Sequence, residues 1–230
     1  MAGAVAKRVT HAVAARPAKR GALRSRARES ARRAREAAYR EIVLEAAERV
    51  FADHGFEPTR IQDIAARAGV SVGTIYGLFP GKAELFQAIH EQRLGDILAH
   101  AREAASAGAA TTLDTLLDGM AGYLEYLMAH PHYLRMHLRE GGAWALGPVH
   151  AAGGQAEAWR EGLAMEAALF RQAIAEGVLV DEDPMLLAKL TTAMHQVLLA
   201  DWVEHGMKAK PKQVVARMKQ LFRHAFVRKD

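Results

Sequence analysis

Residues 59–86 contain the signals of two helices joined by a tight turn. Thr59 and Gln62 have the spacing of a capping box, which predicts the start of a helix. Gly69 suits the left-handed residue that commonly ends a helix. Four apolar residues between these signals fall on one helical face: Ile61, Ile64, Ala65 and Ala68. The first helix of the pair is therefore expected to bury one side.

A second, shorter helix is expected after the turn. The hydroxyl of Ser71 can cap its first turn, and Pro80-Gly81 ends it. Two helices joined by a tight turn that contains glycine form a helix-turn-helix. The second helix of this motif normally lies in the major groove of DNA. The spacing therefore predicts a DNA-reading unit.

A third helix is predicted before the pair, with Gly55 just past its end. Its apolar residues recur at helical spacing: Ile42, Val43, Ala46, Ala47, Val50 and Phe51. We expect this helix to pack across the other two, with Ile75 and Phe79 completing a shared core.

These residues together resemble the DNA-binding domain of the tetracycline-repressor (TetR) family. The resemblance rests on about 50 residues in order, which include Arg40, Ile42, Ala46-Ala47, Val50-Phe51-Ala52, Gly55-Phe56, Thr59, Ile61, Asp63-Ile64-Ala65, Ala68-Gly69-Val70-Ser71, Gly73-Thr74-Ile75-Tyr76, Phe79, Lys82 and Leu85. The resemblance implies an all-α fold. Three N-terminal helices would bind DNA, and a larger C-terminal helical bundle would bind a ligand and form a dimer.

The family pattern also implies roles for single residues. The positions that resemble phosphate contacts are Thr59, Ser71, Tyr76 and Lys82, and those that resemble the base-facing surface are Val72, Gly73, Thr74 and Gly77. Hydroxyls, an ammonium group and helix N-terminal amides suit phosphate oxygens. Apolar methyl groups can contact a thymine methyl.

The recognition helix departs from the family pattern at Gly77-Leu78, where larger polar or aromatic residues are more usual. It therefore has no long polar side chain to read bases. Close backbone approach at Gly77 and the shape of the DNA are expected to contribute to specificity.

Charge is concentrated at the N-terminus. Residues 1–35 hold eleven Lys or Arg and one Glu, so this tail carries +10 of a chain whose net charge is +5. We expect the tail to be disordered to about residue 30. It is either a basic arm that contacts DNA beside the helix-turn-helix, or a solvated extension or mis-assigned start. A mitochondrial transit peptide is the least favoured interpretation, because the rest of the chain resembles a bacterial regulator.

Helices are also predicted over the remaining two-thirds of the chain, and no convincing strand is found. One helix should run from Lys82 to about residue 105, and later ones should open at Thr111, Pro131, Pro184 and Pro211. The expected domains are the tail (1–35), the DNA-binding domain (36–82) and a ligand-binding and dimerisation domain (83–230). The stretch 173–184 also resembles the family, which implies a homodimer through about residues 184–227. The alternative is that these last helices are buried within one subunit.

Aromatic and soft apolar residues of the C-terminal domain favour a pocket for a mostly apolar small molecule. The candidate lining residues are Tyr123, Tyr133, Met136, Trp144, Trp159, Phe170, Met194 and His195. Each of them alone is better explained as an ordinary core residue, and the family resemblance decides in favour of a pocket for the domain as a whole.

The sequence argues against catalysis and against a cofactor. It contains no Cys, and the histidines at 130, 132, 137 and 150 lack zinc-ligand spacing. No apolar run is long enough to cross a membrane, and a cytoplasmic location is expected.

We therefore predict a ligand-responsive, homodimeric repressor that binds a palindromic DNA operator. The alternatives are a nonspecific nucleic-acid binder that depends on the basic tail, and an enzyme built on a helical bundle.

Overall fold

The computed structural model describes residues 15–139, 141, 144 and 154–229, and in this part of the chain the regular structure is helical. The expected all-α class is confirmed, since the described residues contain a single isolated bridge, between Leu179 and Val227, and no strand. In chain order the helices are α1 (Ala15–His54), α2 (Ile61–Ala68), α3 (Val72–Leu78), α4 (Lys82–Ser106), α5 (Thr112–Ala129), α6 (Pro131–Arg139), α7 (Gly154–Ala175), α8 (Pro184–Glu204) and α9 (Pro211–Phe226).

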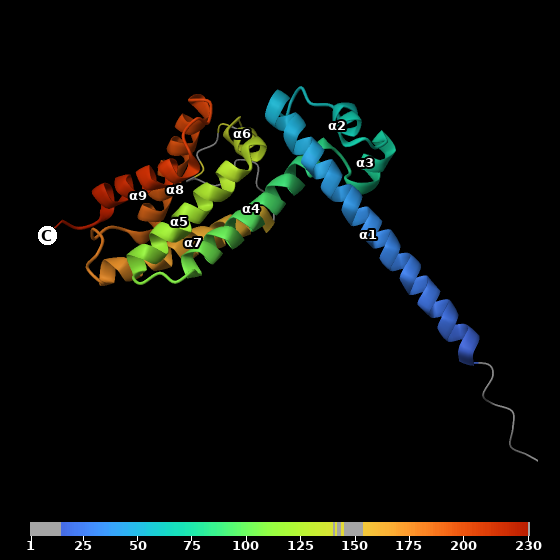
Figure 1. The fold of residues 1–230 in the computed structure, drawn as a ribbon, viewed down its shortest axis with the longest axis horizontal. Helices are drawn as coiled ribbons and strands as arrows, with labels where there is room; N and C mark the ends of the chain where they lie inside the picture. The colour runs from blue at the N-terminus through green and yellow to red at the C-terminus, as the bar shows by residue number, and fades with distance from the viewer. Residues whose placement is uncertain (1–14, 140, 142–143, 145–153, 230) are drawn as a thin grey trace, which may run out of the picture.

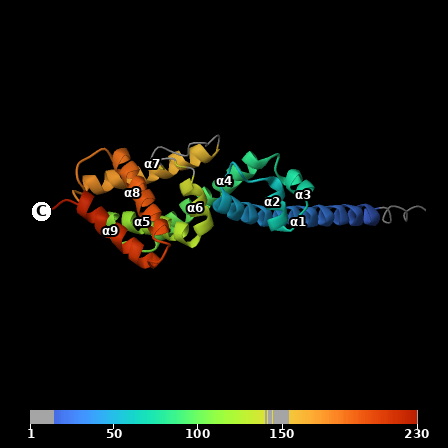
Figure 2. The same cartoon turned by 90° about the horizontal axis from the view of Figure 1, so that it is seen from above.

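The helices form two parts that α4 connects (Figure 1). We call residues 36–82 the head and residues 83–230 the body. In the head, α2 and α3 pack against the C-terminal half of α1. In the body, α4 lies along α5, and α7, α8 and α9 complete the bundle. Viewed from above, head and body follow one another along the long axis of the molecule (Figure 2).

The core of the head agrees with the predicted apolar faces except at one position. Phe51, Ile64 and Ile75 are fully buried, and Phe79 is almost so. Ile42, which was assigned to the buried face of the first helix, is instead 46% exposed. Leu44 is buried in its place, because the face of α1 that meets α2 and α3 begins at Val43.

In the head, the predicted caps are confirmed at two helix ends and wrong at one. Gly69 ends α2 with a left-handed φ of 67°, and the Ser71 hydroxyl accepts the amide N–H of Thr74 at 3.0 Å. The Thr59–Gln62 capping box does not form. Instead α2 begins one residue later, where the Asp63 carboxylate accepts the backbone N–H of Arg60 at 3.2 Å.

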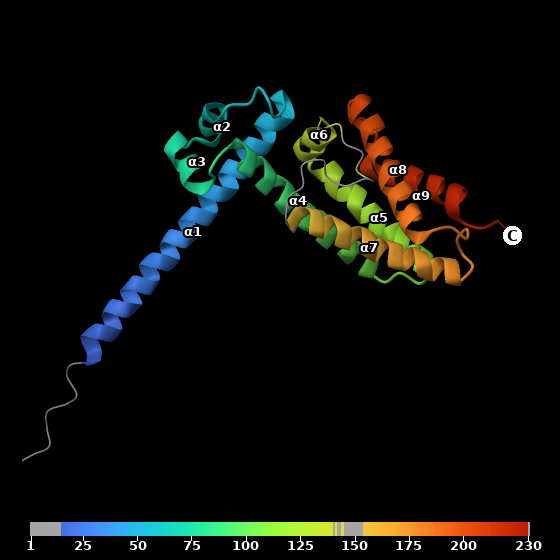
Figure 3. The ribbon, with the colours of Figure 1, turned by 180° about the vertical axis from the view of Figure 1, so that it is seen from behind.

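The expected disorder to residue 30 is wrong for the described part of the tail, because α1 is helical from Ala15. Alanine and arginine are strong helix formers, and extending a helix that is already packed avoids the cost of a new nucleus. An ion pair of 2.6 Å between Glu29 and Arg33, one turn apart, adds to this preference. The N-terminal half of α1 extends away from the rest of the molecule (Figure 3), and residues 1–14 lie outside the described residues.

The predicted helix starts at Lys82, Pro131, Pro184 and Pro211 are observed, and the helix expected to open at Thr111 begins at Thr112, with Thr111 as its cap. The Thr111 hydroxyl accepts the amide N–H of Asp114 at 3.1 Å, as expected of a cap. Gly141-Gly142 and Gly147-Pro148 predict a loop, most of which lies outside the described residues.

The contact between α4 and α5 is closest at Gly122. A Cβ at this position would lie 2.7 Å from Cβ of Ala104 and 3.1 Å from the carbonyl oxygen of His100. Gly95 of α4, in contrast, has open space around it. Gly122 and Gly95 both lie within helices, but a neighbouring helix approaches only Gly122.

We predict opposite effects for alanine at these two glycines. Gly122→Ala should lower the free energy of unfolding by about 1–3 kcal/mol, because the new methyl group forces α4 and α5 apart. Gly95→Ala should raise it by about 0.5–1 kcal/mol through helix propensity alone. Denaturant unfolding at one protein concentration measures both, and a gain from both variants would contradict the close packing of α4 on α5.

Candidate nucleic-acid interface and ligand cavity

The outer face of α3 is free of other elements. Ser71, Gly73 and Gly77 are exposed, and the large aromatic side chain of Tyr76 is 54% exposed. Val72 and Thr74 are partly exposed on the same short helix, whereas Ile75 anchors it in the core. The Ser71 and Thr74 hydroxyls lie 2.8 Å apart and are hydrogen-bonded to each other. Six of the eight predicted DNA-contacting residues therefore lie on one accessible surface.

Thr59 does not share this surface. Its side chain is 3% exposed, and its hydroxyl donates to the carbonyl oxygen of Gly55 at 2.6 Å. The hydroxyl closes the turn after α1, so its burial does not favour the assignment as a phosphate contact, which stays a prediction. Arg60, the next residue, is exposed at the start of α2 and is better placed to meet a phosphate.

Lys82 has a structural role that the sequence pattern did not indicate. Its ammonium group donates to the carbonyl oxygens of Phe56 at 2.7 Å and Glu57 at 3.0 Å. It also lies 4.3 Å from the centre of the Phe56 ring. These contacts bind the start of α4 to the turn between α1 and α2. The predicted contact of Lys82 with phosphate stays a prediction beside this structural role.

A cation that the family pattern includes, but that was given no role, lies beside α3. The guanidinium of Arg40 stacks 4.5 Å from the centre of the Phe79 ring, directly after α3. The head as a whole holds five Lys or Arg and seven Asp or Glu, a net charge of −2. Its positive charges therefore act locally, and the strongly basic part of the chain is the extension of α1.

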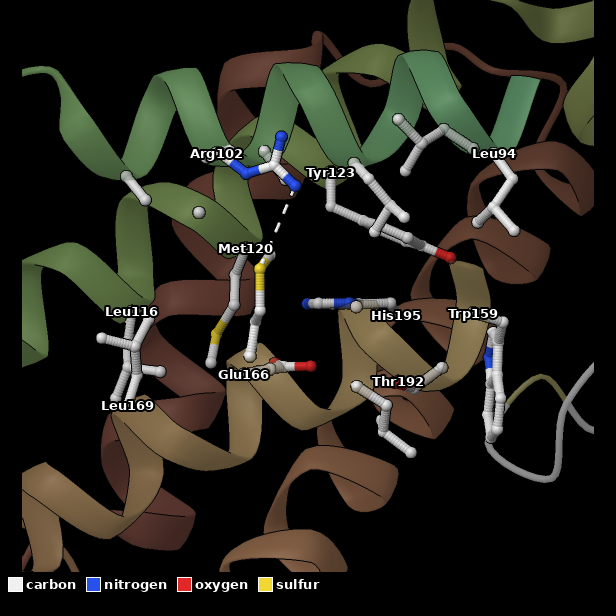
Figure 4. Close-up of a pocket in the computed structure, with 18 of the residues that line it drawn as sticks. Leu94, Arg102, Leu116, Met120, Tyr123, Trp159, Glu166, Leu169, Thr192 and His195 are labelled. Atoms are coloured by element: carbon white, nitrogen blue, oxygen red, sulfur yellow. Dashed lines mark hydrogen bonds between the residues drawn. The ribbon is translucent and has the colours of Figure 1, made fainter. Parts of the chain in front are cut away.

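The body contains a cavity of about 560 Å³ between α4, α5, α7 and α8 (Figure 4). This volume lies within the range of small-molecule sites. Five of the eight predicted pocket residues line it: Tyr123, Tyr133, Trp144, Trp159 and His195. The other three do not. Met136 and Phe170 are buried in the core, and Met194 packs against it, because each lies on a helix face turned away from the cavity.

Sequence reasoning missed the polar residues of the cavity wall, notably Arg102, Glu166 and Thr192. Glu166 of α7 faces the cavity (Figure 4), and burial raises the pKa of its carboxyl to about 8. Burial also lowers the pKa of His195 to about 3, so this imidazole is neutral at physiological pH. Burial and the nearby Glu166 charge raise the pKa of Tyr123. A carboxyl on a largely apolar helix gives no periodic signal in a sequence, which explains why Glu166 was missed.

A chain of aromatic contacts joins the cavity wall to the head. His137 of α6 stacks on Trp144 at 4.4 Å between ring centres, and both line the cavity. The His137 ring lies 5.5 Å from that of His90 on α4. Next along α4, Phe86 lies 4.7 Å from His90 and 5.1 Å from Phe51 in the core of the head.

A polar link runs parallel to the aromatic one. Arg93 of α4 donates to the buried Glu48 of α1 at 2.7 Å and to the Tyr126 hydroxyl of α5 at 3.1 Å. The Arg93 guanidinium thus links α4 both to α1 of the head and to α5 of the body. If a molecule in the cavity displaced α4 or α6, the aromatic contacts and the Arg93 hydrogen bonds would pass this displacement to the head.

The described residues contain no cluster of His, Asp or Glu arranged to hold a metal ion. His130 and His132 instead make local hydrogen bonds, to the Tyr126 carbonyl at 2.7 Å and to Arg135 at 2.9 Å respectively. Of the helices in the described part of the chain, none is long and apolar enough to cross a membrane.

A head with an outward helix-turn-helix, connected by one long helix to a body with a cavity, is the architecture of a class of bacterial DNA-binding regulators. The family model "Bacterial regulatory proteins, tetR family" matches residues 43–89. The transcriptional repressor SCO4008 of Streptomyces coelicolor is 32% identical over 147 residues, which cover 62% of this chain and 68% of that protein. The chain belongs to the TetR family of transcriptional regulators.

Solved structures share the fold at lower sequence identity. A TetR-family regulator from Shewanella has a TM-score of 0.67 and 20% identity, with 83% of this chain and 99% of that one aligned. The FadR regulator of Bacillus subtilis, solved in complex with stearoyl-CoA, has a TM-score of 0.62 and 18% identity, with 79% and 96% aligned. The fold therefore extends over head and body, beyond the segment that the family model matches.

We predict that Lys82→Met destabilises the head. It leaves the carbonyls of Phe56 and Glu57 without their charged donor, so the free energy of unfolding should fall by about 1–3 kcal/mol. Lys212→Met, which removes an exposed charge from α9, is the matched control and should change it by less than about 0.5 kcal/mol. If Lys82→Met weakened DNA binding without changing the free energy of unfolding, the result would contradict this structural role and support a phosphate contact by Lys82.

Proposed function

We propose that this chain is a homodimeric transcriptional repressor that binds a palindromic operator and is released by a small molecule. The observation that carries the proposal is the uncovered face of α3, where Ser71, Gly73, Tyr76 and Gly77 are exposed together. A large aromatic residue on an otherwise small-residue surface is well suited to contact a sugar–phosphate backbone. Val72 and Thr74 lie at the N-terminal end of this helix, which in a helix-turn-helix faces the base edges.

An apolar stripe on α8 supports the dimer. Leu186 and Leu190 are each 44% exposed and Val197 is 67% exposed, and their spacing of four and seven residues places them on one face. Leu221 of the adjacent α9 is 39% exposed. The alternative of complete burial within one subunit does not fit these exposures. A second copy of the same surface would cover the stripe and give two recognition helices, as a palindromic site requires.

The long basic helix supports a further contact with DNA. The head has a net charge of −2 and residues 1–35 carry +10, so most of the electrostatic attraction to phosphate must come from the N-terminal extension. From residue 26 to residue 42 every residue of α1 is exposed. We propose that this arm contacts the DNA that flanks the operator, while α3 determines the sequence specificity.

The cavity is the proposed effector site. One of its walls is the C-terminal part of α4, whose other end is bound to the head through Lys82 and Phe86. The stearoyl-CoA complex of a FadR regulator with this fold supports a ligand role for the body. An effector acts only through its different affinity for two arrangements of the head, and a coupling of about 1–3 kcal/mol corresponds to a 5- to 150-fold change in operator affinity.

The test of the function is fluorescence anisotropy against the duplex upstream of the chain's own gene, with a scrambled duplex as control. We expect preferential binding of the upstream duplex by two subunits per site. Thr74→Ala should lower the ratio of affinities for the upstream and the scrambled duplex about tenfold, because it removes a base-facing group. Tyr76→Phe should lower the affinity for both duplexes by the same factor, because it removes only a hydroxyl that is expected to contact phosphate.

Equal binding of both duplexes by every variant would contradict the assignment of α3. A chain without residues 1–35 separates the remaining alternative. Under the proposal it binds more weakly and with a shallower salt dependence but keeps its preference for the operator. Complete loss of binding would instead favour a nonspecific nucleic-acid binder that depends on the tail.

We predict that Val197→Glu breaks the dimer. Val197 is the most exposed residue of the apolar stripe, and a charge there would be desolvated when a second copy covers the stripe. The variant should therefore sediment as a monomer at concentrations where the parent chain is a dimer. Gln92→Glu adds the same charge to an exposed site on α4 and should leave the dimer intact. A dimer that survives Val197→Glu would place the interface elsewhere.

A further inference from the structure

We propose that the cavity selects lipophilic organic cations, with the Glu166 carboxylate as the partner of the ligand's positive charge. This inference rests on the proposed function, because it assigns a chemical class to the effector of that site. It is carried by the geometry of the cavity wall and by two polar groups that face the cavity from different helices.

Glu166 is the one carboxylate among the described residues that line the cavity. It projects from α7 into the open space between Met120 and Trp159 (Figure 4). No hydrogen bond or ion pair is recorded for it among the described residues, whereas carboxylates elsewhere in the body, such as Asp118 with Lys219 at 2.7 Å, have a cationic partner. Glu166 is partly buried in this largely apolar wall. A carboxylate that is partly desolvated without a partner is costly, and a bound cation would reduce this cost.

The second group is His195 of α8, which is 4% exposed and whose Nε2 has no hydrogen-bond partner. Its ring stacks under that of Tyr123 at 5.1 Å between centres. Buried polar atoms are nearly always paired in folded proteins, so an unpaired one beside a cavity indicates a position for a ligand. Because this imidazole is neutral, it does not repel a cation.

The remaining wall fits the apolar part of such a ligand. The rings of Tyr123 and Trp159 offer π faces, which attract quaternary ammonium groups. The other charged and titratable groups of the cavity wall among the described residues are Arg102 from α4, Tyr123 from α5, Tyr133 and His137 from α6, and His195 from α8. Arg102 is exposed and its guanidinium contacts the sulfur of Met165 at 4.0 Å. Solvent therefore screens this competing positive charge.

The raised pKa of Glu166 gives the proposal a pH signature. A permanent cation pairs only with the ionised carboxylate, which is a small fraction at pH 6 and about half at pH 8. The affinity should therefore rise at least tenfold between pH 6 and pH 8 and level off above that. His195 remains neutral over this whole range and does not contribute.

The experiment is calorimetric titration of the full chain with three probes that share one alkyl chain: decyltrimethylammonium, decanol and decanoate. We expect the cation to bind at least tenfold more tightly than the other two at pH 8. Glu166→Gln should lower its affinity at least tenfold and flatten the pH profile, while the affinity for decanol stays unchanged. Unchanged decanol binding also shows that the cavity of the variant is intact.

Glu161→Gln is the matched control, since it removes an exposed carboxylate from the same helix that does not line the cavity. It should behave like the parent chain. Decanoate as the tightest probe, equal affinity for all three, or a cation affinity insensitive to Glu166→Gln would each overturn the proposal.

Operator binding measured beside these titrations separates this inference from the proposed function. Cation binding that depends on Glu166 but leaves the operator complex intact would support the ligand class and contradict release by an effector. Release of the operator by decanol or decanoate, without release by the cation, would support the proposed function and overturn the cation assignment.

Discussion

Helix α4 is the element on which the arrangement of the two parts depends. Its first turn is bound to the head by the Lys82 ammonium and by the fully buried Leu85. Its second half forms one wall of the cavity, from Leu94 to Ser106. A continuous helix of 25 residues is about 37 Å long and does not bend easily, so a shift at the cavity end becomes a shift of the head.

The contacts beside α4 explain why such a shift would be transmitted rather than absorbed. Phe86 and His90 are packed between aromatic rings of the head and of α6, and Arg93 bonds to both α1 and α5. Closely packed side chains of this kind do not deform gradually, because small gaps already lose contact energy. Cavity occupancy and head position are therefore expected to change together.

The head could be predicted almost completely from the sequence, because its signals are local. Gly69, Ser71 and the apolar faces of three short helices specify the turn, the cap and the core. The intramolecular contacts of Thr59 and Lys82 could not be predicted, and their DNA-contacting roles stay predictions. Both have side chains that suit a phosphate, but each donates to backbone carbonyls of the turn between α1 and α2, at Gly55 for Thr59 and at Phe56 and Glu57 for Lys82. Such contacts depend on the path of the chain and have no sequence spacing.

The cavity was predictable only in part for a similar reason. Tyr123, Trp159 and His195 were found as aromatic or polar residues of the right kind, and so were Met136 and Phe170, which are ordinary core. Residue type indicates a soft apolar interior, but the rotation of each helix decides which residues face the cavity. Glu166 is the residue with the largest chemical consequence, and its significance appears only when its burial and its missing partner are seen together.

Coupling between cavity and head is tested most directly by its reciprocity. The affinity of the chain for decyltrimethylammonium is measured at pH 8 with and without a saturating concentration of operator duplex. Thermodynamic linkage predicts that the duplex weakens ligand binding by the same factor, about 5- to 150-fold, by which the ligand weakens operator binding. Equal ligand affinity in the presence and absence of the duplex would mean that the cavity and the head are not coupled.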